Sequence, residues 1–504
     1  MGALMDAYNK AQSGLGQVVG VVGDAGVGKS RLLLEFKNQL TPGEFAYFEG
    51  RCLHFGNAMT YLPVLDILRS YFKIKEGDQE SLIKKHMAEK ILQLDEKLHG
   101  ILPSFHELLS LKVEDETYQK LEPIHKRDKT FEALRNLLVR ESLNKPIILV
   151  VEDLHWIDKS SEESLEDLLG SIAGSRVFLI FSYRPEYVHA WGSRSYHSQV
   201  NLNRLSNRES LAMMAHILGT RDIERDLENM VLEKTEGIPF YIEEFIRSLT
   251  DLRVIEKREH TYYLSKNIRD VAIPATIQDV IMARVDALPG GAKEVLQTGS
   301  AIEREFSYQL LKMVTEMDER ELIHHLSGLK DAELVFERGI YPDSSFIFKH
   351  ALTREVVYDS ILTRKKKNFH EEIGNAIEEL YKENIVEYYG VLAEHYISSE
   401  NYEKGAEYSK LAGKKARRAN SNLDAIEYGK KCLLCLESLP ISDSTQRLII
   451  DARRTLAAYY TTLARLPEAY EAVAPIVDLA EKLNYQKSLP WIYNIIGFYS
   501  LYVE

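Results

Sequence analysis

The sequence predicts a multidomain protein in which an α/β core with a parallel sheet is followed by mostly helical segments. Short apolar runs alternate with longer amphipathic stretches from Gln17 to about Ser182, a pattern typical of a parallel sheet covered by helices. Strand patterns largely disappear after Leu202, and a loose helical repeat begins near Glu387. Because a chain of 504 residues is too long for one ordinary hydrophobic core, several cores are expected.

The α/β core is expected to contain four strands. Each is too short, and too rich in β-branched or aromatic residues, to be an isolated helix. The four strands are predicted at residues 18–23, 45–49, 147–152 and 177–183. In open α/β folds, ligands bind at the carboxyl edge of such a sheet.

The middle of the chain is predicted to form two helical units. Residues 207–218 and 222–235 are expected to be helices of a small lid, which ends at Gly237-Ile238-Pro239. Compact helices follow at 276–288, 291–301, 306–314 and 319–329, and then two strand-like runs at 334–337 and 345–349. Helices closed by a hairpin indicate a winged helix.

A tetratricopeptide pattern fits the C-terminal part of the chain twice. The first copy places Leu392, Ala393, Tyr396, Gly405 and Ala412, and the second, at the same spacing, places Leu456, Ala457, Tyr460, Ala469 and Ile476. Pro475 departs from the pattern and should kink the second copy. Stacked helical hairpins would present a concave protein-binding surface, and a plain helical bundle is the alternative.

Four domains are therefore predicted. They are an α/β core at 1–202, a helical lid at 203–270, a winged-helix-like domain at 271–362 and helical repeats at 363–504. The apolar stretch at 491–503 reads as a packed helix that stops at Glu504 without a cap or a polar tail. The last domain is therefore expected to be truncated.

Composition narrows the class of protein. The net charge of -13 argues against a whole-chain basic surface for nucleic acid. The basic cluster at 364–367 reads as a solvated helix end. Three cysteines are too few for a disulfide framework, so a cytoplasmic location is expected, and Cys432 and Cys435 read as buried helix positions. No signal peptide or membrane-spanning run is recognised.

A phosphate-binding loop follows the first strand. The segment reads Gly23-Asp24-Ala25-Gly26-Val27-Gly28-Lys29-Ser30, which satisfies G-x-x-x-x-G-K-[ST] between a strand and a helix. The glycines let successive N–H groups face phosphates, and the following helix adds its positive end. Lys29 is expected to contact the β- and γ-phosphates and Ser30 to coordinate Mg²⁺, so the predicted ligand is Mg·ATP. Arg31, directly after the loop, is included among the nucleotide-binding residues.

Two acidic residues end the strand at 147–152. In this register Glu152 takes the Mg²⁺ position, and Asp153 is placed to orient or deprotonate the attacking water. Helix-capping carboxylates at a strand end are the alternative reading.

Arg184 and Pro239 complete the predicted site. Arg184 follows the strand at 177–183, and it could read the γ-phosphate or merely pair with Glu186. Gly237 and Pro239 could bring the lid to the nucleotide, or they could form a simple turn between helices.

Five motifs together resemble one family, the AAA-like, STAND-type signalling ATPases. The resemblance is greatest to the ATPase and tetratricopeptide region of bacterial class III adenylate/guanylate cyclases. That region is related to the LuxR-type ATP-binding regulators. The motifs are Gly-Asp-Ala-Gly-Val-Gly-Lys-Ser-Arg at 23–31, Val-Val-Glu-Asp-Leu-His-Trp-Ile-Asp at 150–158, Ser-Tyr-Arg-Pro-Glu at 182–186, Glu-Gly-Ile-Pro-Phe-Tyr-Ile-Glu-Glu at 236–244 and Phe-Lys-His-Ala-Leu-Thr-Arg-Glu-Val-Val-Tyr at 348–358. Residues 272–279 resemble the family's entry to its winged helix.

The resemblance implies a nucleotide-dependent switch. ATP would bind in the cleft, a winged helix would pack against the ATPase core, and the helical repeats would sense a protein partner. The winged helix of this family usually serves intramolecular packing, so it is weak support for DNA binding. Assembly into a nucleotide-dependent oligomer is left open.

Two departures from the family are visible. The Phe-Val-Gly-Arg segment that commonly contributes to the adenine pocket is missing before Gly2, which puts the nucleotide affinity in question. Residues 1–22 cannot hold a cyclase catalytic domain, so a cyclase would have to be an attached or partner output domain.

Three functions are compatible with the motifs. The first is an ATP-binding regulatory module with slow or switch-like hydrolysis. The second is a LuxR-type transcriptional regulator whose DNA-binding domain lies outside the sequence. The third is a protein-interaction scaffold in which the nucleotide only stabilises the fold.

Overall fold

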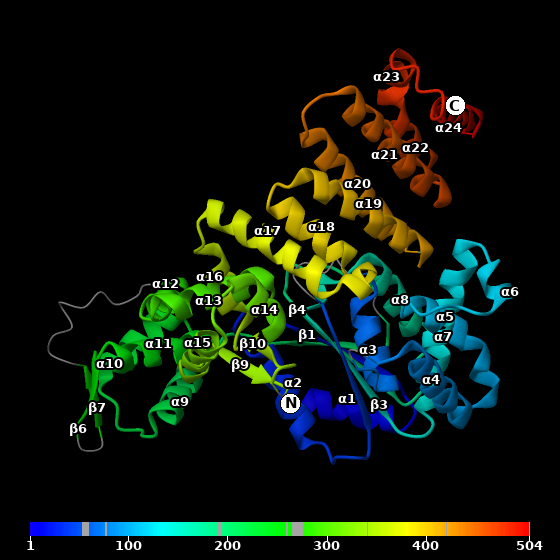
Figure 1. Cartoon of the computed structure of the whole chain (residues 1–504). Helices are drawn as coiled ribbons and strands as arrows, with labels where there is room; N and C mark the ends of the chain where they lie inside the picture. Colours follow the sequence, from blue (N-terminus) through cyan, green and yellow to red (C-terminus); the bar gives the residue numbers. More distant parts are fainter. Residues whose placement is uncertain are drawn as a thin grey trace.

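A computed structural model of the chain describes residues 1–52, 60–75, 78–189, 191, 194–258, 261–264, 276–339, 341–419 and 421–502. Its N-terminal part is an α/β unit with a five-stranded sheet, and the rest is predominantly helical (Figure 1). The predicted fold class, a multidomain protein with a P-loop α/β core and a helical solenoid, is confirmed.

The sheet of the core is entirely parallel, with the order β2-β3-β4-β1-β5. Its strands are β1 (Gln17–Val22), β2 (Ala46–Arg51), β3 (Ile147–Glu152), β4 (Val177–Tyr183) and β5 (His197–Asn201). The four predicted strands are confirmed with shifts of one or two residues at two of them. The fifth strand was not predicted, because its sequence His-Ser-Gln-Val-Asn is short and polar.

Two layers of helices bury the sheet. One face packs against α1 (Gly2–Gln12) and α2 (Lys29–Gln39) through a core that includes Phe36 and Phe178. The other face packs against α3 (Leu62–Phe72), α7 (Pro123–Glu141) and α8 (Lys159–Leu169). Burial on both faces explains why β3 and β4 are continuous apolar runs. The remaining elements of this part are α4 (Glu80–Leu94), η2 (Glu96–Ile101), α5 (Leu102–Leu108), α6 (Glu116–Gln119) and η3 (Leu154–Trp156).

The predicted lid region forms three helices and a hairpin. They are α9 (Asn207–Leu218), α10 (Arg225–Thr235), α11 (Pro239–Asp251), β6 (Ile255–Arg258) and β7 (Thr261–Leu264). A capping box between Ser206 and Glu209 starts α9. The hairpin was not predicted, and α10 begins three residues later than expected.

The next segment, residues 276–380, combines helices with a small antiparallel sheet of order β8-β10-β9. Its elements are α12 (Ile277–Asp286), α13 (Gly290–Ile302), β8 (Glu305–Ser307), α14 (Tyr308–Thr315), α15 (Glu319–Asp331), β9 (Val335–Arg338), β10 (Ser345–Phe348), α16 (Ala351–Asp359) and α17 (Thr363–Leu380). The predicted helix at 306–314 starts later because residues 305–307 form a third strand. Of the predicted winged-helix entry at 272–279, residues 272–275 lie outside the described residues.

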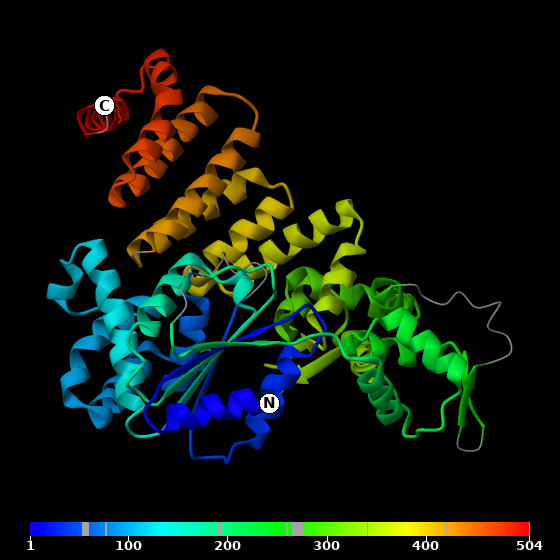
Figure 2. The same ribbon diagram turned by 180° about the vertical axis from the view of Figure 1, so that it is seen from behind.

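Residues 389–473 form helices that stack in sequence order (Figure 2). The elements of the C-terminal part are η5 (Lys382–Tyr388), α18 (Tyr389–Ser398), α19 (Tyr402–Arg418), α20 (Asn422–Ser438), α21 (Asp443–Thr462), α22 (Leu466–Val473), η6 (Ala474–Ile476), α23 (Val477–Lys482) and α24 (Leu489–Tyr502). Gly405 allows a close approach, because a Cβ there would lie 3.1 Å from Cys435 Sγ. The expected kink at Pro475 is confirmed, since the 3-10 segment η6 separates α22 from α23. Cys432 and Cys435 are buried, as expected.

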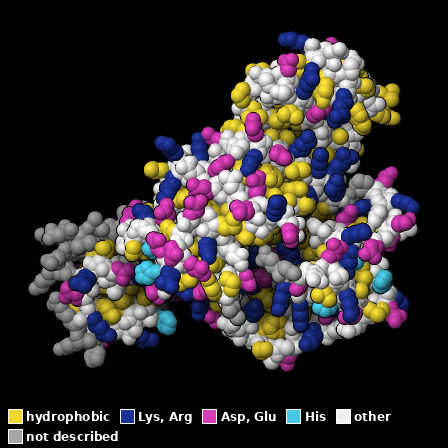
Figure 3. All heavy atoms as spheres, in the orientation of Figure 1, with side chains coloured by type: hydrophobic (Ala, Val, Ile, Leu, Met, Phe, Trp, Pro, Cys, Tyr) yellow, Lys and Arg dark blue, Asp and Glu magenta, His cyan; other side chains and the backbone are white. Residues whose placement is uncertain are grey.

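On the face shown in Figure 3, basic and acidic side chains of the described residues are interspersed. Within the described ranges, no helix combines the length and the apolar character needed to cross a membrane.

Candidate functional site

The loop between β1 and α2 has the backbone that a phosphate cradle requires. Gly26 and Gly28 have positive φ angles of 81° and 99°, which glycine adopts without steric cost. Gly28 is the N-cap of α2, so the N-terminus of that helix points toward the loop. Lys29 Nζ donates to the carbonyl oxygens of Gly23 at 2.7 Å and Asp24 at 2.9 Å. The predicted loop residues therefore lie together as a compact turn.

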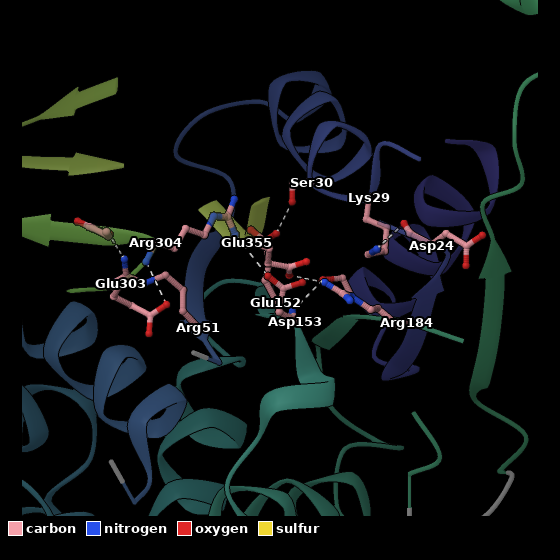
Figure 4. Close-up of polar contacts among 12 residues, drawn as sticks. Asp24, Lys29, Ser30, Arg51, Glu152, Asp153, Arg184, Glu303, Arg304 and Glu355 are labelled. Atoms are coloured by element: carbon pink, nitrogen blue, oxygen red, sulfur yellow. Dashed lines mark hydrogen bonds and ion pairs between the residues drawn. The ribbon is translucent and has the colours of Figure 1, made fainter. Parts of the chain in front are cut away.

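Ser30 and Glu152 meet across the carboxyl edge of the sheet (Figure 4). Ser30 Oγ donates to Glu152 Oε2 at 2.7 Å. Burial raises the pKa of Glu152 to about 7, and the hydrogen bond from Ser30 acts in the opposite direction. The neighbouring Glu49 of β2 raises the Glu152 pKa further. This corner of the site thus brings carboxylates close together, with no cation among the main influences on the Glu152 pKa.

The same corner fits a magnesium ion. A hydroxyl and a carboxylate oxygen at hydrogen-bonding distance are hard oxygen donors, which Mg²⁺ prefers. A cation here would also stabilise the ionised form of Glu152, whose burial favours the neutral form. Ser30 and Glu152 are therefore the residues that would hold the metal.

Asp153 occupies a strained position directly after β3. Its φ of 57° lies in the left-handed region, which a non-glycine residue rarely adopts. Its backbone N–H donates to Ser182 Oγ at 3.1 Å, which fixes the turn. Asp153 Oδ2 forms an ion pair with Arg304 Nη1 at 3.3 Å. Burial raises the pKa of Asp153, while Arg304, Lys29 and Arg184 lower it.

Arg184 lies beside Asp153 at the end of β4 (Figure 4). Its Nη2 forms an ion pair with Glu355 Oε1 at 2.7 Å, and its guanidinium lies 5.6 Å from the centre of the Trp156 ring. Glu355 of α16, rather than the expected Glu186, is thus the ion-pair partner of Arg184.

Both new partners come from the segment 276–380. Arg304 stands between α13 and β8, and Glu355 stands in α16. A third contact joins Arg51 at the end of β2 to Glu305. Sequence reasoning missed these residues, although Glu355 belongs to the quoted motif at 348–358. Arg304 belongs to no quoted motif, so only the fold could reveal it.

The start of α11 packs directly on the phosphate-binding loop. Phe240 N–H donates to the Gly26 carbonyl oxygen at 3.2 Å, and a Cβ on Gly26 would lie 3.3 Å from Ile238 Cγ2. Pro239 stands in the first turn of α11 between these two contact residues. The predicted approach of this segment to the loop is therefore present in the structure.

Arg31 lies apart from the other predicted residues. Its side chain is 74% exposed and pairs with Glu35 one turn further along α2 at 2.6 Å. The helical position turns the side chain outward, toward Glu35 and solvent.

A cavity of about 720 Å³ opens beside the loop. It is lined by Gly23 and Asp24, by Tyr183 at the end of β4 with Tyr187 after it, and by Asn201 at the end of β5 with the residues that follow it. Its volume lies within the range of small-molecule sites. Sequence reasoning missed this wall because it missed β5.

Comparisons with known proteins also indicate a nucleotide-binding domain in this part of the chain. Residues 1–180 match the sequence model of the AAA ATPase domain, and residues 206–260 match that of a domain of unknown function. The N-terminal part of the chain is thus similar to AAA ATPase domains, a nucleotide-binding class. The predicted resemblance to AAA-like ATPases is confirmed.

The chain is also similar in sequence to parts of two longer proteins. An uncharacterized protein of Rhizobium meliloti (strain 1021) is 24% identical over 446 residues, which cover 86% of this chain and 42% of that protein. Adenylate cyclase type 10 of Mus musculus is 25% identical over 170 residues, covering 32% of this chain and 10% of the cyclase. The chain thus spans less than half of the length of either relative.

Among solved structures, the chain resembles a STAND protein with a tetratricopeptide repeat sensor from Pyrococcus horikoshii. The TM-score is 0.46 at 12% identity, and the match covers 99% of this chain and 67% of that one. A chain of Drosophila ORC bound to DNA has a TM-score of 0.29 at 10% identity, over 71% of this chain and 93% of that one.

Proposed function

We propose that the chain is an ATP-binding signal-transduction module that acts as a nucleotide-dependent switch with slow ATP hydrolysis. The observation that carries the proposal is the double contact between the strand ends and the segment 276–380. Arg304 reaches Asp153 at 3.3 Å, and Glu355 reaches Arg184 at 2.7 Å. A segment held by these residues will respond when a γ-phosphate and its metal compete for them.

The residues have distinct roles in this proposal. The N–H groups from Gly23 to Ser30 and the Lys29 ammonium bind the phosphates, and Ser30 with Glu152 would hold Mg²⁺. When bound, the ion would supply positive charge to the phosphate oxygens. Asp153 orients the attacking water and accepts its proton, which requires that its carboxylate be released from Arg304. Hydrolysis is therefore slow while the segment 276–380 is docked.

The domain boundaries remain part of the proposal. We infer an ATPase core at 1–202, a lid at 203–270, a winged helix at 271–362 and tetratricopeptide-like repeats at 363–504. The three-stranded sheet β8-β10-β9 with its helices supports the winged helix, and the stacked helices α18 to α22 support the repeats. This arrangement is that of a STAND-type ATPase.

The output of the switch is proposed to lie in an attached or partner domain such as a nucleotide cyclase. The similarity to adenylate cyclase type 10 supports this choice. The repeats would bind the protein partner that is sensed. A cytoplasmic location is proposed because the three cysteines are free and buried.

Nucleotide binding tests the proposal through one substitution. Lys29→Ala should weaken Mg·ATP binding by about tenfold or more, because a charged hydrogen-bond donor to the phosphates is lost. Titration calorimetry measures the dissociation constant. Lys37→Ala removes the same charge from the exposed side of the same helix and serves as the control. Wild-type affinity in the Lys29→Ala variant would overturn the ATP-binding proposal.

A further inference from the structure

A second cavity lies where the first repeat helices meet the ATPase core. It has a volume of about 500 Å³. One wall comes from α3 and from residues 107–113 of the core, and the other comes from η5, α18, α19 and α20. Figures 1 and 2 both show these repeat helices against the α3 side of the core. The cavity is separate from the cavity beside the phosphate-binding loop, with which it shares no lining residue.

The walls of this interdomain cavity carry more cations than available carboxylates. Its acids are Glu107 and Glu387, and both already have partners. Glu387 pairs with Arg69 at 2.9 Å, and Glu107 pairs with Lys126 at 2.8 Å. Each carboxylate therefore already forms an ion pair with another cation.

Three further cations line the cavity from the last turns of α19. Lys414, Lys415 and Arg418 have no ion pair within the part of the chain that the structure describes. Cations are common at helix C-termini, where they complement the helix dipole. Arg417, in the same turns, does not line the cavity and instead lies 5.7 Å from the centre of the Tyr459 ring. The cavity thus selects three of the four cations of this helix end.

Lys415 makes the imbalance energetically significant. Its side chain is half-buried between the domains. Burial lowers the Lys415 pKa, Glu387 acts in the opposite direction, and Arg69 has a smaller lowering effect. A cation that is partly removed from water without a carboxylate partner is unfavourable, and an anion would restore the missing interaction.

The remaining surface of the cavity is largely apolar. Leu65, Leu109 and Leu111 contribute from the core, and Tyr389 contributes from α18. Mixed walls of this kind, with a few convergent charges, are typical of sites for small organic ligands, and the volume matches that class.

We infer that this interdomain cavity binds a small organic anion, with its carboxylate or phosphate group at Lys415 and Arg418 and its apolar body against the leucines and Tyr389. The ligand would contact the ATPase core and the repeats together. It would therefore stabilise the docked arrangement of the two and act as an effector of any switch between them. The binding step itself does not depend on nucleotide binding at Lys29.

Titration calorimetry with phenyl phosphate and benzoate tests the inference, with benzyl alcohol as the neutral comparison. At least one anion should bind saturably and benzyl alcohol should not, and the preferred anion shows whether a phosphate or a carboxylate is recognised. Two separate variants, Lys415→Gln and Arg418→Gln, should each weaken binding by about tenfold. Arg418 is exposed, so its replacement should not disturb folding. Arg417→Gln should change binding less than about twofold. Binding should be unchanged in the Lys29→Ala chain.

Four results would overturn the inference. They are binding of neither anion to the wild-type chain, equal affinity for benzyl alcohol, equal weakening by Arg417→Gln and Lys415→Gln, and loss of binding in the Lys29→Ala chain. The last result would assign the anion to the phosphate-binding loop. Because this test uses no ATP, its failure is distinguishable from a failure of the proposed ATP binding.

Discussion

At the scale of single residues, Gly237 shows how backbone geometry brings the lid to the nucleotide site. Its φ is 74°, and a Cβ there would lie 2.2 Å from the Leu205 carbonyl oxygen. Leu205 N–H also donates to the Gly237 carbonyl oxygen at 2.7 Å. This turn directs Pro239 and Phe240 onto the phosphate-binding loop.

Gly237→Ala is therefore expected to disturb both the lid and the site. The left-handed conformation costs about 1 kcal/mol for alanine, and the contact with Leu205 adds a backbone displacement. Hydrogen exchange of the α11 amides should accelerate, and the affinity for Mg·ATP should fall. Gly219→Ala is the matched control, since Gly219 has a φ of 69° and no atom within 4 Å of its would-be Cβ. Equal effects of the two substitutions would contradict this account of Gly237.

At the scale of elements, α8 of the ATPase core and α20 of the repeats meet through buried carboxylates. Ser160 Oγ and Ser421 Oγ each donate to Asp424 Oδ2 at 2.7 Å. Asp158 Oδ1 accepts from the Ser161 N–H at 2.9 Å and the Tyr61 N–H at 3.1 Å. Asp158 and Asp424 are 1% and 3% exposed, respectively. The contact therefore places two acids from different domains in one buried region.

The contact is expected to weaken as pH rises. Burial, and then Asp424, raises the pKa of Asp158 from 3.8 to about 7. Burial also raises the pKa of Asp424. Because the pKa is raised on folding, the folded state keeps a carboxyl proton that the unfolded chain releases. The stability of the contact is therefore fully present below about pH 4 and is lost as the pH rises to about 7. The thermal midpoint of the C-terminal helices should therefore decrease as the pH is raised from 4 to 7.

Asp424→Asn should make this fall smaller, because the second buried charge is removed. The exposed Asp443→Asn, in the next helix, is the control. A pH dependence that is identical in Asp424→Asn and wild type would show that the carboxylate pair does not control the contact.

The elements also show where sequence reasoning succeeded. β3 and β4 were predicted at their observed bounds, because strands buried on both faces leave continuous apolar runs. β5 was missed because it is an edge strand with a polar sequence, paired only with β1. The capping box at Thr276 and Asp279 lies within the motif at 272–279, so a local signal for the start of α12 was present.

At the scale of the whole molecule, the α/β core contacts both the segment 276–380 and the C-terminal helices. The phosphate-binding loop was predictable because its chemistry is contiguous in sequence. The pair Asp153 and Arg304 is separated by 151 residues, and an arginine in Glu-Arg-Glu carries no local signal for such a partner. Contacts between segments far apart in the sequence were therefore beyond sequence reasoning, although the proposed switch depends on them.

The central claim is that docking of the segment 276–380 through Asp153 restrains hydrolysis. Steady-state phosphate release in Arg304→Gln tests it most directly, with Arg320→Gln on the exposed side of α15 as the control and Asp153→Asn as the inactive reference. Loss of one partly exposed ion pair should raise turnover by about two- to fivefold, while Arg320→Gln leaves it unchanged and Asp153→Asn abolishes it. Turnover that falls in Arg304→Gln, or that persists in Asp153→Asn, would contradict the account.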